Sequence, residues 1–88
     1  MMVIENRNKL TLDRPATYQI KVPGVLNQRW IKMNGELSIM VGNDEAGLSI
    51  TTLTVTVDQA ALHGLLRCLY SLGLPIISVI FIGIEKNH

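Results

Sequence analysis

Residues 57–84 decide the fold, and they read VDQAALHGLLRCLYSLGLPIISVIFIGI. No charged residue occurs from position 68 to position 84, a run close to the minimum of about 17 residues for a membrane-spanning helix. Two features argue against a span. Gly73-Leu74-Pro75 is typical of a helix end, and the apolar period changes there. Upstream of that end, leucines recur at three- and four-residue steps, at Leu62, Leu65, Leu66, Leu69 and Leu72. Downstream, residues 75–84 form a short β-branched run, which is typical of a strand. The stretch therefore predicts a helix, a turn and a strand.

The first half of the chain alternates strands with one short helix. Apolar and polar residues alternate over 17–22 and again over 36–41, the pattern of half-buried strands. Between them, residues 25–33 place Leu26, Trp30 and Met33 on one helical face, and Asn34-Gly35 ends this predicted helix. The polar loop GNDEAG at 42–47 joins the second strand to a third and predicts a hairpin.

The third strand, residues 48–57, changes phase along its length. Its apolar positions are Leu48 and Ile50 at first, and then positions 53, 55 and 57. Because a slip of one residue reverses the faces of a strand, we predict a β-bulge near Thr51–Thr52. Asp58 follows directly and is a good N-cap for the second helix.

The predicted order is therefore β-α-β-β-α-β. This is the ferredoxin-like arrangement of the α+β class, with a four-stranded antiparallel sheet and both helices on one face. We expect a single domain over residues 16–84, an N-terminal tail over 1–15 and a C-terminal tail over 85–88. Whether Leu10 and Leu12 of the N-terminal tail contact the domain stays open.

Composition limits the chemistry. The chain has 88 residues, a net charge of +1, one cysteine and two histidines. Cys68 has no partner for an internal disulfide, and the inventory is too small for a closed zinc site without carboxylates. Interspersed charges give no footprint for nucleic acid, and the third strand lacks the aromatic residues that RNA-binding domains of this topology use. A single thiol and no apolar secretory segment at the N-terminus favour the cytoplasm.

Four places invite a functional interpretation. His63 has Arg67 at i+4, a poor partner for metal binding, so we interpret it as structural. Gly64 costs roughly 1 kcal/mol relative to alanine inside a helix, which suggests that a side chain, a backbone or a partner passes close to it. Trp30 is either a ligand-stacking platform or, as we favour, an anchor of the short helix. Asn43, Asp44 and Glu45 lack the spacing of a calcium loop and are expected to form a solvated turn.

The segment VDQAALHGLLRCLYSLGLPIISV, at 57–79, resembles the motif V-D-Q-A-A-L-H-G-L-L … L-G-L-P-L-[IL]-S-V of a family of short bacterial proteins of unknown function. Earlier elements of that family, G-x-L-x-x-x-W and G-L-x-I, are matched at Gly24, Leu26, Trp30, Gly35, Leu37 and Ile39. The likeness covers about residues 18–80. The chain departs from the family at Thr54-Val55, where members often carry Gly-Pro, and at Tyr70-Ser71, where they carry charges. The resemblance implies no activity.

We expect a non-catalytic binding or self-assembly module that uses no cofactor and acts away from membranes and nucleic acid. The alternative is a small-molecule sensor similar to ACT domains, which would bind its ligand at a subunit interface near Pro23-Gly24, where backbone N–H groups collect. The last strand is apolar on both sides, and large exposed apolar patches usually mark contacts. We therefore predict a homodimer, or a higher even oligomer, that packs open sheet faces together; an unknown protein partner is the other possibility. The predicted interface residues are Ile77, Val79, Ile80, Phe81, Ile82 and Gly64.

Overall fold

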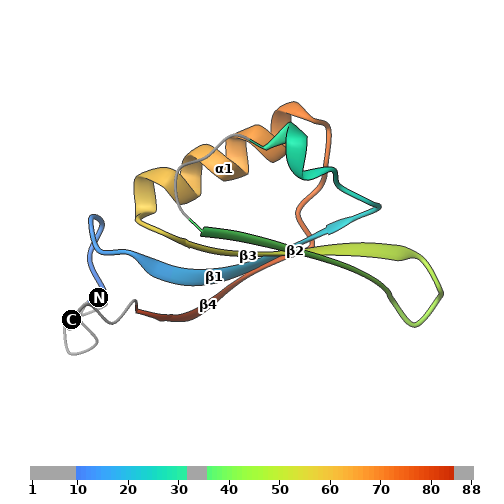
Figure 1. Cartoon of the computed structure of the whole chain (residues 1–88), viewed down its shortest axis with the longest axis horizontal. Helices are drawn as coiled ribbons and strands as arrows, with labels where there is room; N and C mark the ends of the chain where they lie inside the picture. Colours follow the sequence, from blue (N-terminus) through green and yellow to red (C-terminus); the bar gives the residue numbers. More distant parts are fainter. Residues whose placement is uncertain (1–9, 32–35, 85–88) are drawn as a thin grey trace, which may run out of the picture.

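The computed structural model describes residues 10–31 and 36–84, arranged as one antiparallel sheet with α-helical cover on one face (Figure 1). In chain order the elements are β1 (Ala16–Pro23), the 3-10 helix η2 (Gln28–Trp30), β2 (Glu36–Asn43), β3 (Ser49–Val57), α1 (Gln59–Ser71) and β4 (Ser78–Ile84). The four strands lie in the order β2-β3-β1-β4, and every neighbouring pair is antiparallel. The predicted α+β class and its four-stranded antiparallel sheet are confirmed.

Both ends of α1 follow the local signals of the sequence. The Asp58 carboxylate accepts a hydrogen bond from the Ala61 N–H at 2.8 Å, as an N-cap does. At the other end Gly73 has a φ of 79°. Its N–H donates to the Tyr70 carbonyl, and the Leu74 N–H donates to the Leu69 carbonyl. This pair of bonds is the Schellman motif, so the predicted helix end is confirmed. None of the helices in the described ranges has the length and apolar content to cross a membrane.

The predicted bulge in β3 is wrong. β3 pairs without interruption with both β1 and β2, and its inward positions begin at Thr51, which is fully buried. The Thr51 hydroxyl donates to the Gly24 carbonyl at 2.6 Å and accepts from the Leu26 N–H at 3.1 Å. A threonine thus occupies a core position because both hydrogen-bonding roles of its hydroxyl are satisfied. The register shift of the sheet lies instead between β1 and β4, at Thr17/Tyr18.

In the described part of the predicted first helix, residues 25–31, the structure has one turn of 3-10 helix, η2. Asn27 caps it, because its side-chain oxygen accepts from the Arg29 N–H at 2.9 Å. Leu26 and Ile31 are buried on either side of the turn and fix this segment to the core without a longer helix. The side chain of Trp30 lies outside what the structure describes, as do Met33 and the predicted stop at Asn34-Gly35.

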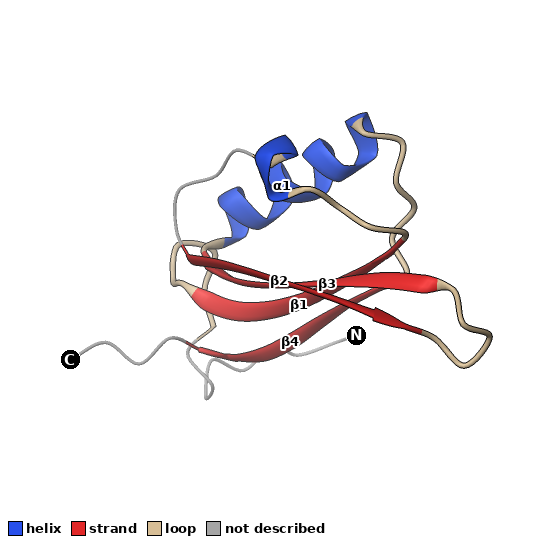
Figure 2. Cartoon of the chain, turned by 45° about the vertical axis from the view of Figure 1, so that its right-hand side comes forward, coloured by secondary structure: helices blue, strands red, loops and turns tan. Residues whose placement is uncertain are grey.

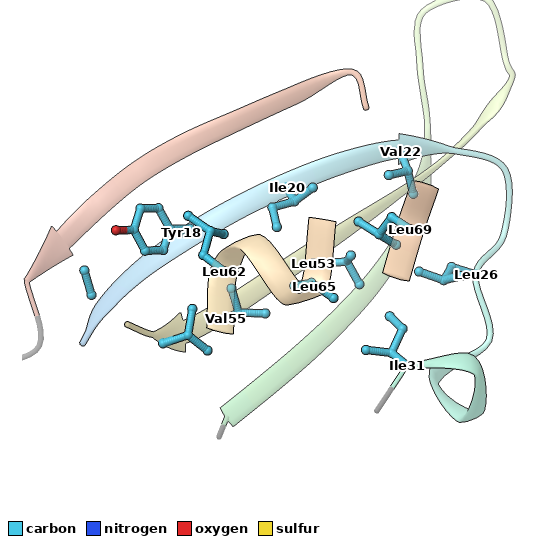
Figure 3. Packing of buried hydrophobic residues seen from close by; sticks show 12 residues of the cluster. Tyr18, Ile20, Val22, Leu26, Ile31, Leu53, Val55, Leu62, Leu65 and Leu69 are labelled. Carbon is cyan, nitrogen blue, oxygen red and sulfur yellow. The ribbon is translucent and has the colours of Figure 1, made fainter. Parts of the chain in front are cut away.

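The core lies between α1 and the two central strands (Figures 2 and 3). Its members are Ala16, Tyr18, Ile20 and Val22 of β1, Leu53, Val55 and Val57 of β3, Leu62, Leu65 and Leu69 of α1, and Leu26 and Ile31 beside η2. Gln59 supports the start of the helix, since its side-chain amide donates to the Tyr18 hydroxyl at 2.7 Å. Three of the five leucines of the predicted stripe are therefore core residues.

The other two leucines differ from the prediction. Leu66 is only partly buried, and Leu72, the helix C-cap, is 40% exposed. The stripe is narrower than predicted because α1 contacts the sheet with one face of three leucines, and positions 66 and 72 fall on its flanks. Near the N-terminus, Leu10 packs against the core while Leu12 is exposed, which answers the question that the sequence left open for these two residues.

Replacement of Leu69 by Ala is expected to lower the free energy of unfolding by about 2–5 kcal/mol, because its side chain is fully buried. The matched variant Leu66→Ala, on the partly buried flank of the same helix, is expected to lose less. Urea unfolding of both variants measures this difference. An equal or larger loss for Leu66→Ala would show that α1 is rotated relative to the described structure.

Replacement of Thr51 by Val keeps the shape of the side chain but leaves the Leu26 N–H without its acceptor. We expect a loss of about 1–3 kcal/mol in the free energy of unfolding, the cost of an unsatisfied buried polar group. The control is Thr54→Val on the outward side of the same strand, which is expected to change stability by less than about 0.5 kcal/mol. Similar stabilities for the two variants would contradict the assignment of Thr51 as a core hydrogen-bonding residue.

Candidate functional site

β4 forms one edge of the sheet and carries the largest group of exposed apolar side chains. Among the residues that the structure describes, β1 is its only neighbouring strand. Together with the segment that leads into it, it exposes between 39% and 53% of six large apolar residues: Ile76, Ile77, Val79, Ile80, Phe81 and Ile82. We call these six residues the β4 patch. All members of the patch except Ile76 are predicted interface residues, and Gly64 is the one predicted interface residue outside the patch. The structure thus brings together the predicted interface residues on and next to the last strand.

The register with β1 shows which side of the sheet each residue occupies. Val79 lies opposite Ile20 and Phe81 lies opposite Tyr18, so both lie on the side that carries α1. The rings of Tyr18 and Phe81 meet edge to face, with centroids 5.8 Å apart. Yet Tyr18 is 5% exposed and Phe81 is 42% exposed. The helix side of β4 is therefore not part of the core, because α1 covers β1 and leaves β4 uncovered (Figure 3).

The other side of β4 faces away from the helix. Ile80 lies opposite Gln19 of β1, in the same row across the sheet as Thr54 and Ser38. Ile82 is the extra residue at the register shift between Gly83, opposite Thr17, and Phe81, opposite Tyr18. Both isoleucines are about half exposed. β4 thus presents apolar side chains on both sides of the sheet and a free edge between them.

Apart from Ile50 at one end of β3, the centre of the open face is polar. Its central rows consist of threonines, Gln19 and Lys21, and the Thr17 and Thr56 hydroxyls hydrogen-bond across β1 and β3 at 2.9 Å. Met40, 71% exposed on β2, lies at the opposite edge. The apolar surface that we predicted for this face is therefore confined to its margins.

Gly64 lies on α1 and not with the β4 patch. A Cβ built at this position meets nothing within 4 Å, so no part of the described chain explains the glycine by close approach.

The remaining chemical candidates are not assembled into a site. His63 is exposed on α1, and Cys68 is partly buried on the same helix. Within the described ranges, no group of three or more His, Cys, Asp or Glu side chains is placed to hold a metal ion. Asp44 organises the β2–β3 turn, since its carboxylate accepts from the N–H groups of Ala46 and Leu48, both at 2.9 Å.

A shallow hollow of about 530 Å³ lies on the open face near the β2–β3 hairpin. Its lining comprises Gln19 and Lys21 of β1, Met40, Val41, Gly42 and Asn43 of β2, Asp44 of the turn, Ile50 and Thr52 of β3, and Ile77 before β4. Sequence reasoning missed this hollow. The alternation over 17–22 did place Gln19 and Lys21 on one face, but the shape of the hairpin beyond β1 (Figure 1) carries no sequence signal.

The backbone near Pro23-Gly24, where we expected a sensor to bind its ligand, already uses several of its donors. The Gly24 N–H donates to the Ser49 carbonyl at 2.8 Å, and the Leu26 N–H donates to the Thr51 hydroxyl. The side-chain oxygen of Asn27 accepts a hydrogen bond from the Arg29 N–H. These three donors are turned inward to the chain and are not presented to a ligand.

Comparison with known proteins identifies the family. The model of a domain of unknown function, DUF8691, matches residues 17–80, which are most of the chain. The chain therefore belongs to this family. Neither the comparison with curated proteins nor the comparison with solved structures gave a significant match.

Replacement of Gly64 by Ala is expected to raise the free energy of unfolding by up to about 1 kcal/mol, because alanine is the better helix former and the position is open. Thermal and urea unfolding measure this gain, and Ala60→Gly on the exposed side of the same helix is the reverse control. A loss of stability in Gly64→Ala would mean that another surface contacts this position in the native protein.

Proposed function

We propose that this DUF8691 domain is a non-catalytic self-assembly module whose working surface is the β4 patch, and that it forms a homodimer. The observation that carries the proposal is the exposure of apolar side chains on both sides of an edge strand. Apolar patches of a few hundred square ångströms on soluble proteins are commonly contact sites. A partner that covers the patch removes this surface from water.

The size of the domain supports the same proposal. A chain of 88 residues has a limited core, and small domains gain stability from disulfides, metals or association. The single cysteine gives no internal disulfide. Association stabilises the folded state by mass action, because the partner binds only the folded chain.

The proposal also states which activities and ligands the domain lacks. It acts as no enzyme and holds no cofactor, and it works in the cytoplasm away from nucleic acid and membranes. In support, His63 and Cys68 lie on α1 while Asp44 lies in the β2–β3 turn, so these described residues do not form the nucleophile, base and orienting group that catalysis requires. The net charge of +1, with both signs interspersed, gives no strong attraction for polyanions. A lone thiol suits a reducing compartment.

The finer identity of the fold and the family belongs to the same proposal. We assign a ferredoxin-like topology in which η2 stands at the place of the first helix. The sheet order supports this, because β3 lies between β1 and β2, and β1 lies between β3 and β4; each crossover then skips one strand, as in split βαβ units. We also equate the family with the short bacterial proteins that carry the V-D-Q-A-A-L-H-G-L-L motif, since the two likenesses span nearly the same residues.

The hollow on the open face favours one alternative, a small-molecule sensor of the ACT-like kind. Its lining combines apolar side chains with one cation, Lys21, and one carboxylate, Asp44. Asp44 is already engaged with backbone N–H groups of its own turn, so Lys21 is the charge available to a ligand. A sensor would bind small carboxylates here, and a thermal-shift screen of metabolites separates it from a pure assembly module.

The homodimer is tested by the mass of the protein in solution. We expect light scattering at high micromolar concentration to give twice the mass of 9.8 kDa for the unmodified protein. Replacing Ile80 by Lys should give a folded monomer or an aggregate, because a charge in the centre of an apolar contact is costly to bury.

The matched control is Leu48→Lys, which introduces the same charge at a 65% exposed leucine in the β2–β3 turn. It should leave the dimer intact. A folded monomer of the unmodified protein under these conditions would overturn the proposed function.

A further inference from the structure

The geometry points to one arrangement of the dimer. β4 of one chain pairs antiparallel with β4 of a second copy along their free edges, so that two four-stranded sheets become one sheet of eight strands. This inference rests on the proposed function and deepens it, because it names the occupant of the β4 patch and the mode of contact. It differs from the packing of open faces that the sequence suggested.

Within residues 10–31 and 36–84, no strand lies along the outer edge of β4. β4 ends the strand order, and an edge strand presents a row of unpaired N–H and C=O groups. Natural proteins protect such edges with charged residues, prolines or bulges. Ser78–Ile84 contains no charged residue and no proline. The register shift falls at Thr17/Tyr18, so Ser78–Phe81 continues in regular register with Tyr18–Lys21 and offers a regular template.

Exposure on both sides of β4 favours pairing along the edge. A face-to-face contact would cover Ile80 on the open side and leave Val79 and Phe81 on the helix side in water. Strand pairing places new cross-strand neighbours on both sides of the joined sheet, within about 5 Å of each side chain directly opposite. Pairing along the edge therefore buries part of Val79, Ile80 and Phe81 at once.

The polar centre of the open face argues against face-to-face packing. That packing would bring Gln19, Lys21 and the threonines of β3 out of water against the same residues of the second copy. Two Lys21 side chains would approach each other, and a buried unpaired charge is strongly unfavourable. Pairing through β4 leaves these central rows solvated.

The other edge of the sheet suits self-pairing less well. β2 begins at Glu36, and Asp44 follows its last residue directly. An antiparallel β2–β2 pair brings Glu36 of one copy toward Asp44 of the other, and like charges across strands are destabilising. Gly42, near the end of β2, also provides no side chain to pack. Between Ser78 and Phe81, β4 has no charged residue and no glycine.

The exposed area is sufficient for a specific contact. A large apolar side chain presents about 200 Å² when fully exposed. The six residues of the β4 patch, at exposed fractions of 39–53%, thus present roughly 500 Å² per chain. Two copies bring roughly 1,000 Å² together, the size at which specific protein interfaces begin.

The regular part of β4 also fixes the centre of the pairing. A two-fold axis beside Ile80 places Ile80 opposite Ile80 of the second copy on the open side. On the helix side it places Val79 opposite Phe81 of the second copy, an aromatic and β-branched pair of the favourable kind. The extra residue, Ile82, then lies toward the end of the paired segment.

Disulfide trapping tests this pairing directly. In a Cys68→Ser background, Ile80→Cys should form a covalent dimer when oxidised glutathione is added, because opposite Cα atoms in an antiparallel pair are about 4.5–5.5 Å apart, within the range of a disulfide. Thr54→Cys in the same row, two strands away, is the control and should stay monomeric on a non-reducing gel. Trapping at Thr54 in place of Ile80 would overturn the arrangement.

A distance measurement gives a second readout. A spin label at Thr54→Cys, in the same background, lies five strand spacings from its copy across the joined sheet, which is about 24 Å at about 4.8 Å each. Packed open faces would bring the two labelled strands to about 10 Å. A distance near 10 Å, or loss of the dimer on labelling, would overturn the inference.

The two failures are distinguishable. If the unmodified protein is a monomer by light scattering, both the proposed function and the β4 pairing fail. If it is a dimer that Ile80→Lys dissociates, but trapping occurs at Thr54 and the label distance is short, self-assembly stands and edge pairing is wrong. Met40→Lys, at the opposite edge of the open face, should leave the β4-paired dimer unchanged and would dissociate a dimer packed through open faces.

Discussion

The structure depends on the fact that, in the part of the chain that is described, a single α-helix covers a four-stranded sheet. A helix with its side chains is about 10–12 Å wide, and neighbouring strands lie about 4.8 Å apart, so one helix shields about two strands. α1 shields β1 and β3, whose inward residues are buried. β2 is left half covered, with Leu37 and Ile39 partly buried against the core, and β4 is left exposed. The apolar surface of β4 is exposed because one helix is narrower than a sheet of four strands.

A second long helix would have changed the surface of the protein. In the predicted fold, residues 25–33 supplied that helix. In the structure the described part of this segment, residues 25–31, supplies one 3-10 turn, held by Leu26, Ile31 and the Asn27 cap. The Thr51 hydroxyl donates to the Gly24 carbonyl and accepts from the Leu26 N–H, and these two hydrogen bonds tie the short connection to the start of β3. The connection therefore folds against one end of the core, and α1 alone provides the helical layer.

Features set by local interactions could be predicted from the sequence. The cap at Asp58, the helix end at Gly73 and the strand positions of β1 and β2 depend on residues a few positions apart, and they were predicted correctly. Thr51 was mistaken for a phase change because its hydrogen-bond partners lie 25 and 27 positions away in the chain. The exposure of Val79 and Phe81 depended on where α1 lies across the sheet, which hydrophobic periodicity does not specify. The strand of the candidate site was thus predictable from its composition, and its two exposed sides were not.

We propose that a second copy covers the edge of the sheet at β4 and not the edge at β2. Backbone amide hydrogen exchange, compared between dilute and concentrated protein, tests it most directly. If a second copy pairs with β4, the amides of Ser78–Ile84 exchange more slowly as the protein concentration rises, while those of Glu36–Asn43 on the opposite edge keep the same rate. Exchange in β4 that stays fast at every concentration, or slowing confined to β2, would contradict it.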